Sequence, residues 1–413
     1  MLYDNAQLVS LYSKAYLESN NELFKTIITE TLDFVGEELT AENGAFYSSL
    51  DADSKNHKNE LEEGAFYYWK KKELKNLINE DYQLFKKYYN INEFGLWGKE
   101  RYVLIRNSTD LEFSKENNIN IKTLKSKVNN WKSTLKKIRL KKNKPNLDDK
   151  VLTSWNALMI SGYVNAYKAL KDEDYLKTAI KNAEFILKNQ IKKDYSLFRN
   201  YKNGKSTIDA YSEDYAFLID AYISLYEVTL DEKWLFIAKE LMNYTITYYF
   251  NSENGMFYFT SNKNNDLISK KVKTLDEVLP SPNSVLANNL FKLSLYFSNT
   301  KFNEIAKQMV TNLYEDILNH PNNYSNWLHL ALNYARPFYE LAIVGKNAKL
   351  INNNLHSLYV PNIIIAGSTS ENSNIELLKN KYLKDETYIY VCNLGTCKLP
   401  QKNINNAMFL IKK

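Results

Sequence analysis

The sequence predicts an all-α (α/α)6 toroid that is followed by a small α/β appendage. Helices that are apolar almost all round alternate along the chain with helices that have a single apolar stripe, and the pair recurs at a spacing of tens of residues. Polar residues collect where the helices of the first kind begin. The distance from Asn156 to Asp214 is 58 positions and that from Asp214 to Asn283 is 69. Such spacings are typical of repeat architectures built from one supersecondary unit.

The first kind of helix is apolar almost all round, which predicts inner helices buried on several sides. These segments are Leu8–Leu17, Trp155–Leu170, Tyr215–Val228 and Ser284–Phe297, with a fifth inner helix expected at Trp327–Ala335. Each of the first four precedes a helix with a single apolar stripe, which predicts an outer ring. The outer stripes begin at Leu23, Leu176, Trp234 and Phe302. Similar turns follow three of the outer helices, at Gly44–Tyr47, Ser196–Arg199 and Gly255–Tyr258.

The ring is expected to be incomplete at its N-terminus, because fewer hairpins are recognisable than the six of a closed (α/α)6 ring. The gap should lie beside the first inner helix and expose apolar flanks on Leu8, Leu11, Tyr12 and Tyr16. Exposed apolar patches beyond a few hundred Å² recruit partners or cause aggregation. We therefore expect the isolated chain to be dimeric or poorly soluble.

The predicted domains are a barrel over residues 1–336, which an excursion interrupts at 60–146, and an α/β appendage over residues 337–413. Helices are expected in the excursion near Lys71–Tyr89 and Ile121–Leu140. Short β-rich runs and intervening helical patterns predict the α/β character of the appendage. The β-rich runs are Tyr339–Val344, Asn362–Ile365 and Tyr388–Val391, and the helices are Ala348–Leu358 and Glu371–Lys381.

Composition narrows the classes of function. The net charge of +6 is spread widely, and the basic run from Lys122 to Lys144 is interpreted as a solvated helix face rather than a nucleic-acid patch. The sequence shows neither a secretory leader nor an apolar run long enough to span a membrane. Cys392 and Cys397 are expected to be buried or idle thiols of a reduced, cytoplasmic protein. No metal site, cofactor, membrane or nucleic-acid partner is expected.

Familiar catalytic motifs are absent: the sequence contains no HExxH, GxSxG, Walker loop or GxGxxG. Of the four histidines, His57, His320 and His356 are expected to have surface or structural roles. His329 alone lies near an expected inner helix, where packing is still the favoured interpretation. Metalloprotease, α/β-hydrolase and nucleotide-binding functions therefore lose support.

Polar residues at the starts of the inner helices are expected to converge on one mouth, since inner helices of one direction begin at the same end of a toroid. Capping of helix N-termini accounts for about half of these residues. Carboxylates among aromatic rings suit sugars, because rings stack on C–H faces and carboxylates accept hydroxyl protons. Two carboxylates about 5 to 10 Å apart can also act as acid and base in glycosidic chemistry. The catalytic candidates are Asp51, Asp53, Asp149, Glu213 and Asp214. The candidates for substrate binding are Asp4, Asn5, Tyr67, Lys150, Trp155, Asn156, Tyr215, Asn283 and Ser284.

Five ordered motifs carry a family resemblance over most of the chain. They are MLYDNAQL, FYSSLDADS with EEGAFYYWKKKEL, LDDKVLTSWNALMI, SEDYAFLIDAYISLYE and LPSPNSVLANNL. With AIVG and YVCNLGTCKLP near the C-terminus, they resemble the part that follows the thioredoxin-like domain in the YyaL / spermatogenesis-associated protein 20 family. The resemblance implies a barrel similar to six-hairpin glycosidases and N-acylglucosamine 2-epimerases. The thioredoxin-like domain and the opening barrel segment are not seen here, so a truncated or split gene product is expected.

The chain departs from the family pattern at Asn146, where the family usually shows His, and the epimerases' catalytic histidines have no counterparts. Two functions follow as hypotheses. The first is a barrel that binds or modifies carbohydrate, through acid/base chemistry of the epimerase, isomerase or glycosidase kind. The second is a non-catalytic barrel scaffold that partners a thioredoxin-like domain or chain.

Overall fold

The computed structural model describes residues 1–263 and 270–411. The chain divides into two compact units, of which the first comprises residues 1–48 and 149–413 and the second residues 49–148. In the part of the chain described, no helix is both long and apolar enough to cross a membrane.

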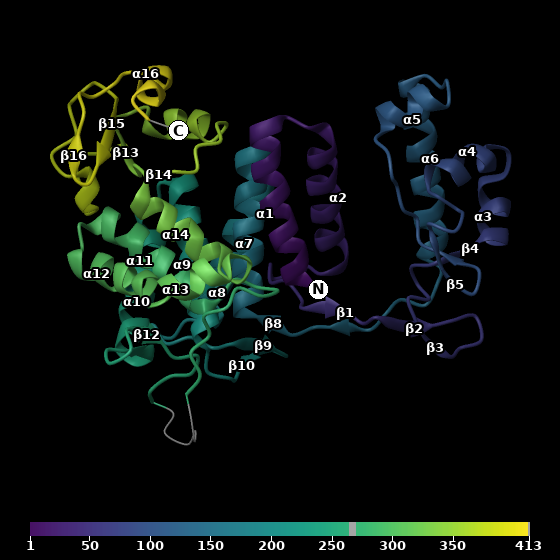
Figure 1. The fold of residues 1–413 in the computed structure, drawn as a ribbon, viewed down its shortest axis with the longest axis horizontal. Coiled ribbons are helices and arrows are strands. Elements are labelled where there is room, and N and C mark those ends of the chain that lie inside the picture. Colours follow the sequence, from purple (N-terminus) through teal and green to yellow (C-terminus); the bar gives the residue numbers. More distant parts are fainter. Residues whose placement is uncertain (264–269, 412–413) are drawn as a thin grey trace. The chain divides into compact units, whose positions relative to one another are not determined.

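The first unit is built from helical hairpins (Figure 1). Its inner helices are α1 (Leu2–Ser19), α7 (Thr153–Leu170), α9 (Ser212–Thr229), α11 (Pro282–Phe297) and α14 (Ser325–Ala335). Its outer helices are α2 (Glu22–Glu38), α8 (Glu173–Asn189), α10 (Glu232–Tyr249) and α12 (Thr300–Asn312), and the short α13 (Tyr314–Asn319) follows α12. Successive inner helices pack on one another in the order α1, α7, α9, α11 and α14. The predicted fold class, an (α/α) toroid with an appendage, is confirmed.

Each hairpin turns by the same two-residue device. The inner helix ends in a left-handed residue, and the next residue is an Asn or Asp whose side chain accepts a hydrogen bond from the outer helix. The pairs are Asn20–Asn21, Lys171–Asp172, Leu230–Asp231 and Ser298–Asn299. A left-handed residue stops a helix and an Asx cap starts the next, which fixes each outer helix directly beside its inner partner.

The inner helices are largely buried, as predicted, and α9 buries Tyr215, Tyr222 and Tyr226 almost completely. The first inner helix is different. On α1, Leu8 is 45% exposed and Leu11 is 61% exposed. The expected apolar flank of α1 is therefore present at these two leucines, while Tyr12 and Tyr16 are only partly exposed.

The appendage is a four-stranded sheet of order β14-β13-β15-β16. Strand β13 (Tyr339–Val344) is fully buried and runs parallel to β14 (Ile363–Ser368), to which it is connected through α15 (Ala348–Leu355). Antiparallel β15 (Tyr388–Asn393) pairs with the other edge of β13 and with β16 (Thr396–Cys397), and α16 (Ile404–Phe409) follows. Leu230, the left-handed residue of the α9–α10 turn, packs into the core of this sheet.

Two predictions about the appendage are wrong. The expected helix Glu371–Lys381 is reduced to the 3-10 turn Glu376–Leu378, because the hydroxyl of Ser373 accepts the backbone N–H of Ile375 in place of a helical carbonyl. The cysteines are not idle thiols: Cys392 and Cys397 form a disulfide. They lie opposite one another in register across the β15–β16 hairpin, which brings their side chains together.

The second unit has its own core. Its helices are α3 (Lys71–Ile78), α4 (Tyr82–Tyr88), α5 (Asp110–Glu116) and α6 (Ile121–Arg139). Its strands are β1 (Ser49–Leu50), β2 (Asp53–Lys55), β3 (Leu61–Glu63), β4 (Trp69–Lys70), β5 (Leu96–Gly98), β6 (Arg101–Tyr102) and β7 (Leu147–Asp148). Trp131 of α6 packs against Phe85 and Tyr88 of α4 within one cluster of buried side chains. The helix expected over Lys71–Tyr89 is broken at Asn79, whose φ of 53° interrupts it.

Candidate functional site at the start of the inner helices

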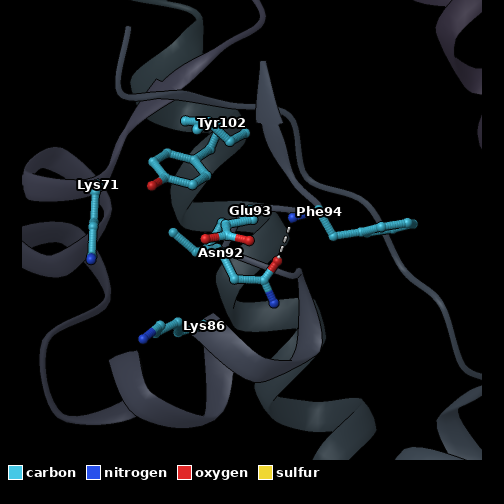
Figure 2. A pocket seen from close by; sticks show the side chains of 8 residues that line it. Lys71, Lys86, Asn92, Glu93, Phe94 and Tyr102 are labelled. Carbon is cyan, nitrogen blue, oxygen red and sulfur yellow. Dashed lines mark hydrogen bonds between the residues drawn. The ribbon is translucent and has the colours of Figure 1, made fainter. Parts of the chain in front are cut away.

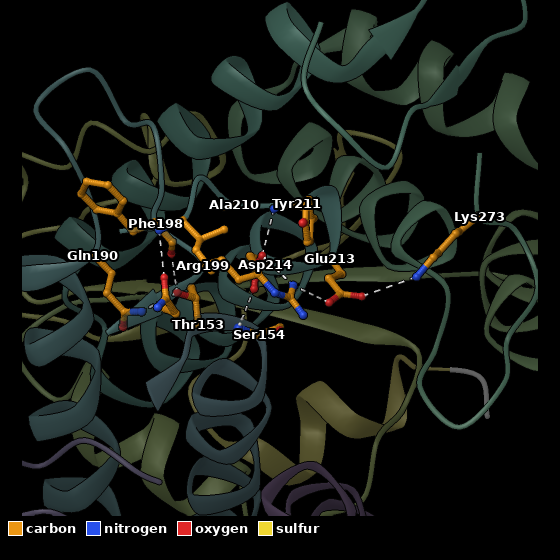
Figure 3. Close-up of polar contacts among 12 residues, drawn as sticks. Thr153, Ser154, Gln190, Phe198, Arg199, Ala210, Tyr211, Glu213, Asp214 and Lys273 are labelled. Carbon is orange, nitrogen blue, oxygen red and sulfur yellow. Dashed lines mark hydrogen bonds and ion pairs between the residues drawn. The ribbon is translucent and has the colours of Figure 1, made fainter. Parts of the chain in front are cut away.

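The candidate site is centred on three charged residues at the N-terminal end of α9 (Figure 3). Arg199 lies between α8 and strand β9 (Asn200–Lys202), and Glu213 and Asp214 lie in the first turn of α9. The guanidinium group of Arg199 donates to Glu213 Oε1 at 2.7 Å and contacts Asp214 Oδ2 at 3.2 Å. One cation therefore holds two adjacent carboxylates that the sequence had identified as catalytic candidates.

Asp214 is completely buried and ties two inner helices together. One carboxylate oxygen accepts the backbone N–H of Ser154 in α7 at 3.0 Å, and the other accepts that of Tyr211 at 2.9 Å. Burial raises the pKa of Asp214 to about 6, although the neighbouring Arg199 favours the charged form. With no accessible surface, Asp214 supports the site and does not reach solvent.

Glu213 is the accessible carboxylate of the pair, with 14% of its side chain exposed. Its second oxygen faces the ammonium group of Lys273 at 4.0 Å. Aromatic rings flank both cations: Arg199 lies over Tyr211 at 4.7 Å, and Lys273 lies over Phe259 at 3.8 Å. The two rings are themselves stacked with centroids 4.7 Å apart. A carboxylate fixed between cations, with aromatic faces beside it, matches the polar and ring groups that orient small ligands.

A second pair of rings lies at the starts of the neighbouring inner helices. Tyr3 of α1 meets Trp155 of α7 edge to face, with ring centroids 4.7 Å apart. Both side chains are partly exposed, and Trp155 directly follows Ser154, whose N–H binds Asp214. The predicted stacking residue Trp155 is therefore the chain neighbour of a residue that binds Asp214.

Three other predicted binding residues act as clamps between repeats. Asn156 accepts the N–H of Phe46 and donates to its carbonyl, at 2.8 and 2.9 Å, and Asn283 does the same to Phe257 at the same two distances. The hydroxyl of Tyr215 accepts the N–H of Leu197 at 2.9 Å. All three side chains are buried. The recurring turns after the outer helices are therefore anchored to the following inner helix.

The remaining predicted residues of the first unit lie outside this cluster or serve helix starts. Ser284 is buried and donates to Asp276 at 2.8 Å, while Asn5 donates to the carbonyl of Met1 at 2.7 Å. Asp4 is in the first turn of α1, with 44% of its side chain exposed. Asp149 pairs with Lys202 at 2.6 Å, and this partner lowers its pKa. Lys150 is exposed, and its carbonyl accepts the hydroxyl of Ser48.

Asp51, Asp53 and Tyr67 belong to the second unit. Asp53 is in β2 and pairs in register with Glu63, and Tyr67 is 41% exposed with its ring against Phe66. Asp51 lines a recess of about 250 Å³ together with Asn146 and the β1–β7 pair. The structure does not place these three side chains with Glu213, so their shared site stays a prediction.

The second unit also has a larger recess, of about 630 Å³, that the sequence did not predict (Figure 2). Its charged and polar lining includes Lys71, Lys86, Asn92, Glu93 and Tyr102. Glu93 and Tyr102 point toward one another in the close-up, while Phe94 turns away. Phe94 is 62% exposed, and its N–H donates to Asn92 Oδ1 at 2.9 Å.

Sequence reasoning missed three residues that shape the first unit's site. Arg199 and Lys273 supply its cations, and Asp276 accepts from Ser281, Ser284 and Asn326 and so joins the starts of α11 and α14. Arg199 had a visible signal, since it ends the recurring turn Ser196–Arg199. Among the described residues, no group of three or more His, Cys, Asp or Glu side chains is arranged to hold a metal ion.

Comparison with known proteins tests the family. Human spermatogenesis-associated protein 20 is 26% identical over 97% of this chain and 56% of its own length, and the rat protein is 25% identical over the same shares. The predicted resemblance to this family is confirmed. A Caenorhabditis elegans relative, uncharacterized protein B0495.5, is 31% identical over 75% of this chain and 46% of its own. The chain thus spans about half the length of these curated relatives, and no protein-family model matches it.

Solved structures align more loosely. A sugar epimerase from a ruminal bacterium aligns with 76% of this chain and 60% of its own, with a TM-score of 0.45 and 13% identity. Cellobiose 2-epimerase from Bacillus thermoamylovorans covers the same shares, with a TM-score of 0.44 and 11% identity.

Proposed function

We propose that the first unit binds a sugar-like ligand at the starts of its inner helices. Glu213 is the carboxylate that accepts hydrogen bonds from the ligand's hydroxyl groups. The observation that carries the proposal is the setting of Glu213: a partly exposed carboxylate between Arg199 and Lys273, with Tyr211 and Phe259 alongside. Hydrogen bonds to an ionised group are stronger than neutral ones, and aromatic faces suit the C–H faces of a sugar ring.

Acid/base chemistry on the bound sugar, of the epimerase, isomerase or glycosidase kind, would fall to Glu213. Asp214 is its neighbour, but it is fully buried and bonded to two backbone N–H groups and Arg199. A proton carrier must come within hydrogen-bond reach of the reacting group. The role of Asp214 is then to hold Arg199 and the starts of α7 and α9 in position.

A thermal-shift screen against mono- and disaccharides tests the proposal. A ligand that binds only the folded state, present at 100 times its Kd, stabilises that state by about 2.7 kcal/mol. Glu213→Gln should abolish the shift that the best sugar gives. The matched control is Glu304→Gln, since Glu304 is exposed on α12. The proposal fails if no sugar gives a shift, or if both variants keep it.

A second candidate, a barrel scaffold that partners a thioredoxin-like domain or chain, is favoured by the exposed leucines of α1. Leu8 and Leu11 are 45% and 61% exposed on α1, whose buried face carries Leu2, Ala6 and Val9. Co-purification of the chain with a separately expressed thioredoxin-like domain, lost in the Leu8→Gln/Leu11→Gln variant, would support this function. Sugar turnover without any partner would argue against it.

A further inference from the structure

The inner helices are not apolar all round, because each carries polar side chains on the face it turns toward its inner neighbours. Asn165 of α7 donates to Ser10 of α1, and Asn288 of α11 donates to the carbonyl of Asn326 in α14. Further along the inner helices, charged or titratable residues take the place of these uncharged polar residues. These residues are Lys14 on α1, Lys168 on α7, Asp220 and Glu227 on α9, Lys292 on α11 and His329 on α14.

Two of the lysines are held by the two carboxylates. Lys292 donates to Asp220 Oδ1 at 2.9 Å, with about a third of each side chain exposed. Lys168 donates to Glu227 at 3.0 Å, and the hydroxyl of Tyr296 donates to the other oxygen of Glu227 at 3.2 Å. These pairs fix two ammonium groups from different helices on either side of α9.

Lys14 is the third cation, and it has neither a hydrogen-bond nor an ion-pair partner among the residues that the structure describes. Its pKa is lowered, first by burial and then by Lys292 and Lys168, although Asp220 and Glu227 oppose them. Its side chain is nevertheless accessible to solvent. Ser10, one turn earlier on α1, accepts a hydrogen bond from Asn165 of α7, so Lys14 lies on the side of α1 that meets α7.

The charges in this interior do not balance. Within this group of described residues, three ammonium groups face two carboxylates, which leaves one positive charge in excess. His329 is the sixth member of this group, and burial, Lys14 and Lys292 lower its pKa, so its imidazole stays neutral and able to hydrogen-bond near neutral pH.

We propose that the interior of the helical ring binds a small oxyanion, a phosphate or carboxylate group, between the ammonium groups of Lys14 and Lys292. Lys14 supplies donors that are unused within the described chain, and Lys292 is fixed in place by Asp220. A compact ammonium group is a common binder of phosphate and carboxylate. The site lies deeper along the helices than Glu213, because Asp220 and Lys14 follow the helix starts by two turns or more. It can therefore exist whether or not a sugar binds at Glu213.

Calorimetric titration of the whole chain with sodium phosphate, sodium sulfate and sodium acetate tests the proposal, with sodium chloride added to hold the ionic strength constant. Lys14→Met should weaken binding of the preferred anion by roughly tenfold, the loss expected for one charge-assisted hydrogen bond. Lys25→Met is the matched control, since Lys25 is exposed on the outer helix α2. Binding of phosphate and sulfate alone indicates a phosphate-type ligand, whereas binding of acetate alone indicates a carboxylate.

Amine labelling gives an independent measurement. At pH 8 the lowered pKa of Lys14 should make it react faster than Lys25 with trinitrobenzenesulfonate, and the preferred anion should protect it. Peptide mass spectrometry follows both lysines in one sample. The proposal is overturned if none of the three anions binds, if Lys14→Met binds as tightly as Lys25→Met, or if the bound anion leaves the labelling of Lys14 unchanged. None of these results depends on Glu213, so the sugar proposal is tested separately.

Discussion

The clamp formed by Asn156 is expected to be worth several kcal/mol of stability. Its side chain makes four hydrogen bonds: it accepts from Phe46 N and Asn182 Nδ2, and it donates to the carbonyls of Phe46 and Leu152. Asn156→Ala removes all four and leaves the buried N–H and C=O of Phe46 without these partners. A buried polar group left unsatisfied costs about 1–3 kcal/mol. Two backbone groups lose their partners, and local relaxation offsets part of the cost. We therefore expect the free energy of unfolding to fall by about 2–4 kcal/mol.

Urea unfolding followed by far-UV circular dichroism measures this loss, and Asn354→Ala is the matched control. Asn354 is exposed on α15, so its replacement should change the free energy of unfolding by less than about 0.5 kcal/mol. Hydrogen exchange gives a local readout, because the Phe46 amide should exchange faster in Asn156→Ala than in the wild type. A loss no larger than that of the control, with unchanged exchange at Phe46, would refute the clamp.

Three further predictions concern the ionisation of Asp214, the exposed leucines of α1 and the left-handed backbone of Ser298. Burial raises the pKa of Asp214 to about 6 in the folded state, above its ordinary value of 3.8, so the folded state keeps a proton that the unfolded state releases between about pH 4 and 6. The free energy of unfolding should therefore fall by about 3 kcal/mol as the pH rises through that window, and Asp214→Asn should lose this slope in urea unfolding at several pH values. In light scattering the wild-type chain should self-associate, and Leu8→Gln/Leu11→Gln should be more monomeric, whereas the same change at exposed Leu350 should have no effect. Ser298 has a φ of 50°, so Ser298→Gly should raise the melting temperature slightly by removing left-handed strain, and Ser298→Ala should not.

Sequence patterns predicted the helical hairpins well because the signal for them is local. Apolar periodicity spans one helix at a time, and the expected strand Tyr339–Val344 and helix Ile121–Leu140 match β13 and α6 to within a residue. The helix expected over Glu371–Lys381 did not form because the Ser373 side chain binds the backbone N–H of Ile375. The prediction of idle thiols was wrong because the disulfide depends on the register of a hairpin that composition does not reveal.

The candidate site was only partly predictable, because the roles of polar residues depend on partners far away in the chain. Asn156 and Phe46 are 110 positions apart, so nothing near Asn156 shows that its amide is already used. The interior charges were missed for another reason. A single charged residue per two turns, such as Lys292 in α11, barely changes the average hydrophobicity of an otherwise apolar helix.

The repeat itself supplies an argument for Glu213. The clamp residues Asn156, Tyr215 and Asn283 are equivalent positions, since each binds the turn that follows the preceding outer helix. Two positions before them stand Ser154, Glu213 and Ser281. The hydroxyl of Ser281 caps α11, whereas Ser154 contributes only its backbone N–H, which binds Asp214. Glu213 makes neither contact and instead directs its carboxylate to Arg199 and Lys273. A carboxylate that contacts two cations and caps no helix at this position supports the proposal that Glu213 binds a ligand.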